Sequence, residues 1–207
     1  MTREWDFAEA VAAQGVIGIV RAKDPATAAE DAGALIDAGL HAVEVSLTTP
    51  DALQVIRDLA AANPDIWVGA GTVLDEVAVV AAVDAGARFL VAPHTTEATI
   101  RAARRRGVPI VPGAATPTEA LRALEVGATM VKLFPASLYG PSVVRDMLAA
   151  LPQVPLVPTG GVTRETAQDY LSAGATAVGM GSGLTRGPAG DPTTDAAALL
   201  KTLRGGA

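Results

Sequence analysis

Residues 125–135 read EVGATMVKLFP, a glycine at the end of a helical pattern followed by a short apolar run. This order is typical of a helix C-cap, here Gly127, leading into a buried strand. The same order recurs in four other stretches: DAGLHAVEVSL (37–47), DAGARFLVAP (84–93), RRGVPIVPG (105–113) and SAGATAVGMGS (172–182). Five such junctions predict alternating helices and strands around a parallel sheet.

Three further apolar runs, VIGIVR, DIWVGAGT and VPLVPTGG, bring the number of expected strands to eight. Consecutive strand ends are 19 to 28 residues apart, which leaves room for one helix and two short loops. We therefore predict an α/β fold, a single (β/α)8 TIM barrel domain over residues 1–207. An extra N-terminal helix is expected at 4–14 and the last barrel helix at about 195–204. The strands are expected to end near Arg21, Glu44, Thr72, Pro93, Pro112, Lys132, Gly160 and Gly181.

The choice of fold decides where the functional site is expected. A Rossmann-like sheet shares the alternation, but GAGTVL (69–74) lacks the GxGxxG spacing of a dinucleotide-binding turn. In a barrel, catalytic groups lie at the carboxyl ends of strands, and phosphate binds after strands 7 and 8. The expected helix starts are Asp24-Pro25, Thr49-Pro50, Asp75, Thr95-Thr96, Thr116-Pro117 and Thr163.

Composition narrows the classes of function. The chain has no cysteine and two histidines, which excludes disulfides and thiolate metal sites and argues against a metal-dependent mechanism. A net charge of −6 argues against a nucleic-acid partner, and the basic run at 104–106 fits the end of a helix. The stretch MTREWDFAEAVAAQG lacks the apolar block that a signal peptide has, and no apolar run has membrane-spanning length. We expect a cytoplasmic protein with no membrane partner.

Two ionisable residues lie inside expected strands. Lys132 stands between Val131 and Leu133, and Glu44 stands between two valines in AVEVSL. Because side chains alternate across a strand, each residue points away from its apolar neighbours, towards the barrel interior. Burial lowers the pKa of a lysine and frees its amine as a nucleophile. We expect both residues to be catalytic, with Glu44 as general acid and base. The alternatives are a lysine at the rim or a buried ion pair.

Other strand ends offer groups for binding anions. Arg21 can hold a carboxylate or phosphate through two parallel hydrogen bonds, or form a salt bridge at the rim. The glycine-rich stretches TGG (159–161) and GMGSG (179–183) can present backbone N–H groups to a phosphate, although ordinary tight turns have the same composition. His94 and His41 fit loop and structural roles.

Taken together, seven motifs resemble the 2-keto-3-deoxy-6-phosphogluconate (KDPG) aldolase family, whose members also cleave 4-hydroxy-2-oxoglutarate (KHG). The resemblance implies that Lys132 forms a Schiff base with pyruvate, that Glu44 moves protons and that Thr72 binds the pyruvyl carboxylate. It further implies a pyruvate pocket, a phosphate site, no metal or organic cofactor, and a homotrimer. The pocket residues would be Pro93 and Phe134, and the phosphate residues Gly160, Gly161, Gly181 and Ser182. The motifs are VEVSLTTPDA, VGAGTVL, VAPH, PGAATPTEA, VKLFPA, VPTGGV and VGMGS, within residues 7–190.

The sequence departs from the better-known branch of this family at one position. That branch has an arginine four residues after the glutamate, where this chain has Thr48. Another branch of the family, and the related phosphogalactonate aldolases, carry an arginine at the end of strand 1, which Arg21 matches. Thr159 before the Gly-Gly pair fits the gluconate type, since the galactonate enzymes tend to have an apolar residue there. We predict cleavage of KDPG to pyruvate and glyceraldehyde 3-phosphate. The alternatives are a KHG or phosphogalactonate aldolase, a phosphate-binding barrel isomerase or epimerase, or an inactive scaffold.

Overall fold

The computed structural model describes residues 3–187 and 189–205, in which helices and strands alternate. The strands are β1 (Val16–Val20), β2 (Ala42–Ser46), β3 (Trp67–Gly71), β4 (Phe89–Val91), β5 (Ile110–Val111), β6 (Gly113–Ala114), β7 (Val131–Leu133), β8 (Leu156–Pro158) and β9 (Val178–Met180). The helices are α1 (Arg3–Gln14), α2 (Pro25–Asp37), α3 (Ala52–Ala62), α4 (Glu76–Asp84), α5 (Glu97–Arg105), α6 (Pro117–Val126), the 3-10 turn η1 (Ala136–Leu138), α7 (Ser142–Ala150), α8 (Arg164–Ser172), α9 (Ser182–Thr185) and α10 (Pro192–Gly205).

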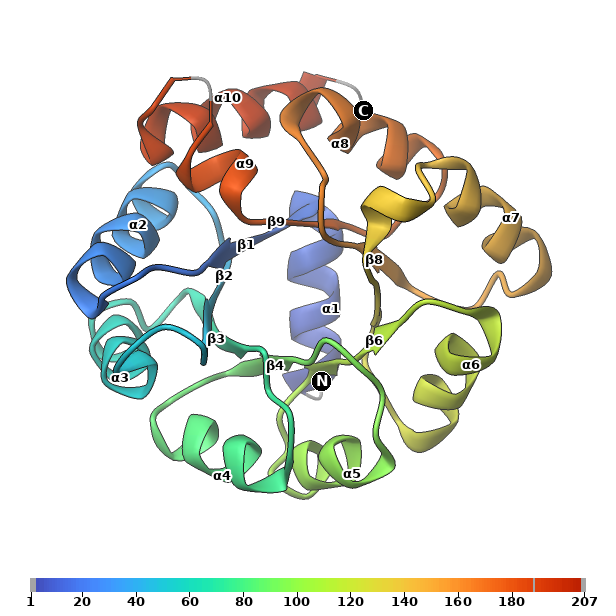
Figure 1. The fold of residues 1–207 in the computed structure, drawn as a ribbon, viewed down its shortest axis with the longest axis horizontal. Helices are drawn as coiled ribbons and strands as arrows, with labels where there is room; N and C mark the ends of the chain where they lie inside the picture. The colour runs from blue at the N-terminus through green and yellow to red at the C-terminus, as the bar shows by residue number, and fades with distance from the viewer. Residues whose placement is uncertain (1–2, 188, 206–207) are drawn as a thin grey trace.

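The strands form a curled parallel sheet with helices outside it, which confirms the predicted TIM-barrel class (Figure 1). One sheet has the order β5-β4-β3-β2-β1-β9 and the other the order β6-β7-β8. Pro112, which has no N–H group, divides the expected fifth strand into β5 and β6, while its carbonyl accepts a hydrogen bond from the Lys132 N–H group (2.9 Å). Between β8 and β9 there is no regular ladder but one isolated bridge, Thr159 with Gly179. The hydrogen-bonded ring is therefore not continuous at this point.

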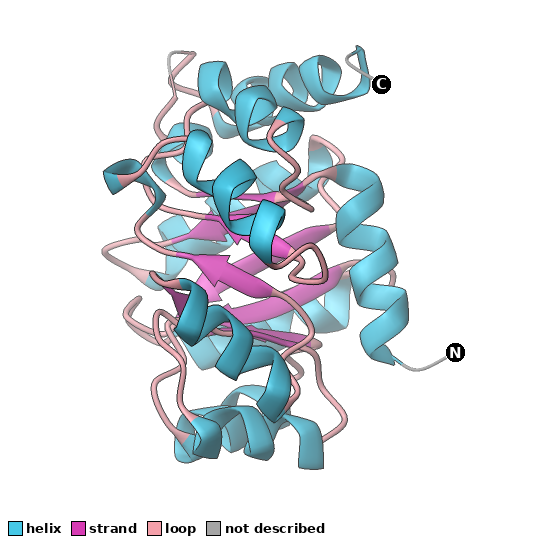
Figure 2. Cartoon of the chain, turned by 90° about the vertical axis from the view of Figure 1, so that its right-hand side faces the viewer, coloured by secondary structure: helices cyan, strands magenta, loops and turns pink. Residues whose placement is uncertain are grey.

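Helix α1 covers the amino-terminal end of the barrel. It crosses the centre of the ring in Figure 1, and in Figure 2 it stands at the end from which the strand arrows point away. Its Phe7 is fully buried, stacks on Phe89 (4.7 Å between ring centroids) and meets Trp67 edge-on (5.2 Å). The expected extra helix at 4–14 is therefore confirmed, and it leaves the carboxyl ends of the strands as the accessible end.

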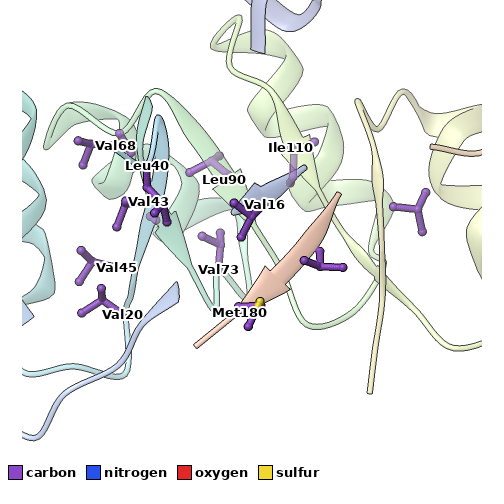
Figure 3. Close-up of a cluster of buried hydrophobic side chains, with 14 of the residues drawn as sticks. Val16, Val20, Leu40, Val43, Val45, Val68, Val73, Leu90, Ile110 and Met180 are labelled. Carbon is purple, nitrogen blue, oxygen red and sulfur yellow. The ribbon is translucent and has the colours of Figure 1, made fainter. Parts of the chain in front are cut away.

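Alternate strand residues pack in two apolar layers. The larger layer lies between sheet and helices, and Figure 3 shows part of it, including Val43, Val45 and Met180. The smaller layer fills the barrel and includes Phe7, Trp67 and other inward-facing side chains. Because Val43 and Val45 face outward, Glu44 between them faces inward, as the alternation predicts.

Helix ends follow the predicted caps at most positions. Gly39, Gly86, Gly107, Gly127 and Gly174 all have positive φ, the conformation that ends a helix at low cost for glycine. The side chains of five expected residues accept the N-cap hydrogen bond, namely Asp24, Asp75, Thr96, Thr116 and Thr163.

Three expected boundaries were wrong. α3 begins at Ala52 after Asp51, not at Thr49-Pro50, because the buried hydroxyl of Thr49 accepts a hydrogen bond from the distant Ala22 N–H group (3.2 Å). Strand β2 continues past Glu44 to Ser46, so Glu44 lies within the strand. α10 begins at Pro192, three residues before the expected position 195.

No helix in the described parts of the chain has the length and apolarity needed to cross a membrane.

Candidate active site

A cleft of about 480 Å³ opens at the carboxyl ends of the strands, a volume in the usual range for small-molecule sites. It collects predicted residues from β1, β7, β8, β9 and the loops that follow them, although these segments are far apart in the sequence. The predicted residues in its lining are Arg21, Lys132, Phe134, Thr159, Gly160, Gly161, Gly181 and Ser182.

Lys132 lies in the middle of β7 and points into the barrel. Its neighbours Val131 and Leu133 pack in the outer layer, and only 7% of Lys132 is exposed. The Nζ atom lies 4.9 Å from the centroid of the Phe134 ring. Burial lowers the pKa of Lys132; the carboxylate of Glu44 opposes this shift and the charge of Arg21 adds to it. The lowered pKa increases the fraction of neutral amine, which is the nucleophilic form.

Glu44 faces the same interior from β2 and is 2% exposed. Burial raises its pKa, although the charges of Lys132 and Arg21 both favour the ionised form. Its Oε2 atom has no hydrogen-bond partner within the described residues, and none of the ion pairs formed there joins Glu44 to Lys132. A polar atom in this state can accept or deliver a proton without first breaking an ion pair.

A small inner cavity separates the two catalytic candidates. It has a volume of about 10 Å³ and is lined by Glu44, Lys132, Thr159 and apolar side chains. That volume is close to the minimum for one water molecule, and the cavity has polar groups to hold it. A water bound in this cavity would contact both Glu44 and Lys132, an arrangement that suits proton transfer between them.

Two glycines make room for these side chains. A Cβ atom on Gly71 would lie 2.6 Å from Oε1 of Glu44, and a Cβ atom on Gly179 would collide with the side chain of Thr159. Real Cβ atoms do not come this close to other atoms. The backbone of β3 and β9 can therefore approach the site only because these two positions have no side chain.

A cluster of hydroxyl groups lies beside β2 and β3. The Ser46 Oγ atom lies 2.8 Å from Oγ1 of Thr48 and 2.8 Å from Oγ1 of Thr72. Thr72 has a φ of 59°, a left-handed conformation that non-glycine residues seldom adopt and that often marks a functional position. Thr72 is therefore fixed in direction, although it is outside the lining of both the cleft and the inner cavity.

The loop after β8 is built to expose backbone N–H groups. Gly160 and Gly161 have φ values of 89° and 79°, and the carbonyl oxygen of Gly160 accepts a hydrogen bond from Ser137 N–H (2.9 Å). A Cβ atom on Gly161 would lie 2.5 Å from the Cβ atom of Ser137. Consecutive residues in this conformation form a concave turn that suits an anion.

Comparison with known proteins places the chain in a family. The model of the family "KDPG and KHG aldolase" matches residues 8–192. The chain belongs to this family. Its members are aldolases and therefore lyases, so the chain is an enzyme of that class.

Individual relatives carry two substrate names. The 2-dehydro-3-deoxy-6-phosphogalactonate aldolase of Escherichia coli K12 is 39% identical over 91% of this chain and 94% of its own. The 2-dehydro-3-deoxy-phosphogluconate aldolase of Pseudomonas aeruginosa is 39% identical over 68% of this chain and 64% of its own. The solved KDPG aldolase of Legionella pneumophila, with pyruvate captured at low pH as a covalent carbinolamine intermediate, is 30% identical, covers 94% of each chain and has a TM-score of 0.81.

Within this aldolase, three predicted residues lie outside the lining of the cleft: Glu44, which lines the inner cavity, Thr72 and Pro93. Pro93 follows β4, is half-buried, and its carbonyl group faces Gly113 of β6. Thr72 belongs to the hydroxyl cluster. His41 is exposed and His94 is half-buried, and neither lines the cleft. No group of three or more histidine, aspartate or glutamate side chains in the described residues is arranged to hold a metal ion.

Sequence reasoning missed one charged residue of this aldolase's cleft. Arg186 lines the cleft from the end of α9, a four-residue helix too short to show a periodic pattern. The available signal was the spacing between Ser182 and Arg186, since residues four apart share one side of a helical turn.

Proposed function

We propose that this protein is a class I aldolase that cleaves KDPG to pyruvate and glyceraldehyde 3-phosphate. The observation that carries the proposal is the pairing of Lys132, whose pKa is lowered by burial, with Glu44, whose pKa is raised, around one small cavity. Two ionisable groups buried together without forming an ion pair are costly to a fold and suit proton transfer.

The first half of the reaction uses Lys132 as a nucleophile. Its neutral amine adds to the C2 ketone of the substrate to form a carbinolamine, and loss of water gives an iminium ion. Glu44, acting through a water in the inner cavity, removes the proton of the C4 hydroxyl group. The C3–C4 bond then breaks, its electron pair moves to the iminium to form an enamine, and glyceraldehyde 3-phosphate leaves.

The second half returns the enzyme to its starting state. The enamine is protonated at C3, with Glu44 as the source of the proton, and water hydrolyses the resulting iminium to release pyruvate and the free amine of Lys132. Each step is a proton transfer, an addition or an elimination at the substrate, and the scheme calls for no metal or organic cofactor.

The remaining cleft residues are assigned to the two ends of the substrate. Arg21 and Thr72 bind the carboxylate, and Phe134 with Pro93 shapes the pyruvate pocket. Gly160, Gly161, Gly181 and Ser182 receive the phosphate. This assignment of Arg21 is supported by its place in the cleft lining beside Lys132, and by its charge, which acts on both Lys132 and Glu44.

The phosphogalactonate substrate is the second candidate. It is favoured by the 39% identity to the E. coli phosphogalactonate aldolase over nearly the whole chain. Thr159, the residue before the Gly-Gly pair, supports the gluconate configuration by its resemblance to the gluconate type, and it lines both the cleft and the inner cavity. Comparing kcat/KM for the two C4 epimers tests the choice, and a preference for the galactonate epimer would overturn the gluconate assignment.

Borohydride trapping tests the mechanism itself. Reduction in the presence of pyruvate should inactivate the enzyme and leave one adduct on Lys132, found by peptide mapping. The Lys132→Ala variant should show no adduct and no turnover while remaining folded, since it removes a buried amine without adding bulk. An adduct on Lys23 or Lys201, or no adduct on the wild-type enzyme, would refute the proposal.

We also propose that the enzyme is a cytoplasmic homotrimer. The apolar side chains Leu74, Val77 and Val80 on and beside α4 are 53%, 77% and 42% exposed, and an exposed apolar group of this kind suits a subunit contact. Light scattering should give three times the mass of one chain, and the mass of a monomer would overturn this part of the proposal.

A further inference from the structure

Arg186 is a second arginine in the lining of the cleft, besides Arg21. Arg186 follows α9, and its backbone N–H group donates a hydrogen bond to the backbone carbonyl oxygen of Ser182 (3.0 Å). The two residues are therefore one helical turn apart and share one side of it. Arg186 lines the main cleft together with Ser182 and Thr163, and it also lines an adjoining pocket of about 300 Å³ with Arg164.

Arg186 and Arg21 act on different ionisable groups. The charges that shift the pKa values of Lys132 and Glu44 are those of each other and of Arg21. Arg186 instead lowers the pKa of Asp31 on α2, although burial raises that pKa overall. Arg186 is exposed and forms no ion pair with the residues that the structure describes, so its guanidinium is free to bind an anion.

A buried carboxylate holds the loop that carries Arg186. Asp195 on α10 is 1% exposed; its Oδ1 atom accepts a hydrogen bond from Ala189 N–H (3.2 Å) and lies 3.6 Å from Nη1 of Arg164. A Cβ atom on Gly187 would collide with the same carboxylate. Asp195 therefore joins α8, α10 and the loop after α9, and its carboxylate pairs with Arg164, whereas Arg186 lines the cleft without an ion-pair partner among the described residues.

We propose that Arg186 binds the substrate phosphate through its side chain and that Asp195 is the positioning residue that fixes the Arg186 loop. This inference rests on the proposed aldolase function and adds a side-chain cation to a phosphate site otherwise made of backbone N–H groups and Ser182. A guanidinium can form two parallel hydrogen bonds to a phosphate, which also fixes the orientation of the bound group.

The test compares a phosphorylated substrate with its unphosphorylated analogue. Steady-state kinetics are measured on KDPG and on 2-keto-3-deoxygluconate for the wild type and for Arg186→Gln, Arg186→Lys and Arg145→Gln. Arg145→Gln is the matched control, because Arg145 is exposed on α7, outside the cleft, and its replacement changes the net charge equally.

We expect Arg186→Gln to lower kcat/KM for KDPG by roughly 10- to 100-fold more than for the analogue, the size of effect that a hydrogen bond to a charged group gives. Arg186→Lys should lose less, since it keeps the charge but not the paired donors. Equal losses on both substrates, no loss, or the same loss in Arg145→Gln would overturn the proposal. A wild-type enzyme that forms no pyruvate adduct on Lys132 would instead refute the aldolase mechanism, so the two failures are distinguishable.

Asp195→Asn tests the positioning role. It keeps the shape of the side chain and removes its charge, so we expect a higher KM for KDPG with little change in kcat. Combined with Arg186→Gln, it should add much less than its separate effect, because both changes act on the same contact. Additive losses, or a fall in kcat on both substrates, would show that Asp195 serves only the stability of the fold.

Discussion

The two ends of the barrel differ in what their side chains do. At the amino end, Phe7 of α1 packs on Phe89 and Trp67 and covers the interior with aromatic rings. At the carboxyl end, Lys132 and Glu44 are buried without forming an ion pair, beside glycine-rich loops. The contrast shows that the fold separates stability from chemistry. Apolar packing at the amino end offsets the free-energy cost of burying two ionisable groups at the carboxyl end.

The largest effect is expected at the carboxyl end, from Glu44→Gln. The amide keeps the shape of the side chain but cannot move protons, so kcat should fall by about 10²- to 10⁴-fold. The exchange of pyruvate methyl protons with solvent should be lost as well, whereas an adduct should still form slowly. Glu30→Gln on the exposed face of α2 is the control. A loss under about tenfold would show that another group moves the protons.

The amino end is tested by Phe7→Ala. Removing a fully buried ring should lower the free energy of unfolding by about 3–5 kcal/mol in urea denaturation. Trp5→Ala on the same helix is the control, because Trp5 is 63% exposed and its removal should cost less than about 0.5 kcal/mol. If kcat/KM of the folded Phe7→Ala protein also falls strongly, the two ends are not independent.

Arg21→Ala tests the proposed carboxylate site. We expect a loss of about 1.5–3 kcal/mol in the binding of pyruvate and of phosphorylated substrate alike, the range for hydrogen bonds to charged groups. Lys23→Ala, an exposed neighbour in the same loop, is the control. If pyruvate trapping is unchanged while only the phosphorylated substrate suffers, Arg21 belongs to the phosphate site.

The smallest effect concerns stability and pH. Burial lowers the pKa of Lys132 below its ordinary value of 10.5, so the unfolded chain binds more protons than the folded one between the two pKa values. Folding stability due to this residue must rise with pH in that window, with a slope below about 1.4 kcal/mol per pH unit. In urea unfolding we expect Lys132→Met to have a higher free energy of unfolding than the wild type at lower pH, and this difference should shrink as pH rises towards 10.5. A difference that stays constant with pH would contradict this.

Local rules explain why much of the fold could be predicted. The five glycines at helix ends and the inward direction of Lys132 and Glu44 follow from backbone conformation and strand alternation, which depend on neighbours in the sequence. Thr49 shows the limit. Its local pattern is that of a cap, but its hydroxyl binds Ala22, which no short window reveals.

The site shows the same division. Strand-end positions led to seven cleft residues, because parallel strands bring their carboxyl ends together, and the family resemblance added Phe134. Arg186 and Asp195 were not found, because their relation depends on where the loop between α9 and α10 folds back against Arg164. Contacts of this kind arise from packing between segments, and a pattern of residue types does not encode them.

The glycines at positions 71 and 179 limit how this enzyme can change its substrate. A methyl group added at position 71 would collide with Glu44, and one added at position 179 would collide with the Thr159 side chain. These two positions beside the site therefore tolerate almost no substitution. The side chain of Arg186 has no such restriction, since it is exposed and lines the cleft. Directed evolution towards new aldehydes should therefore accumulate changes at positions of this kind, while the proposed chemistry at Lys132 is retained.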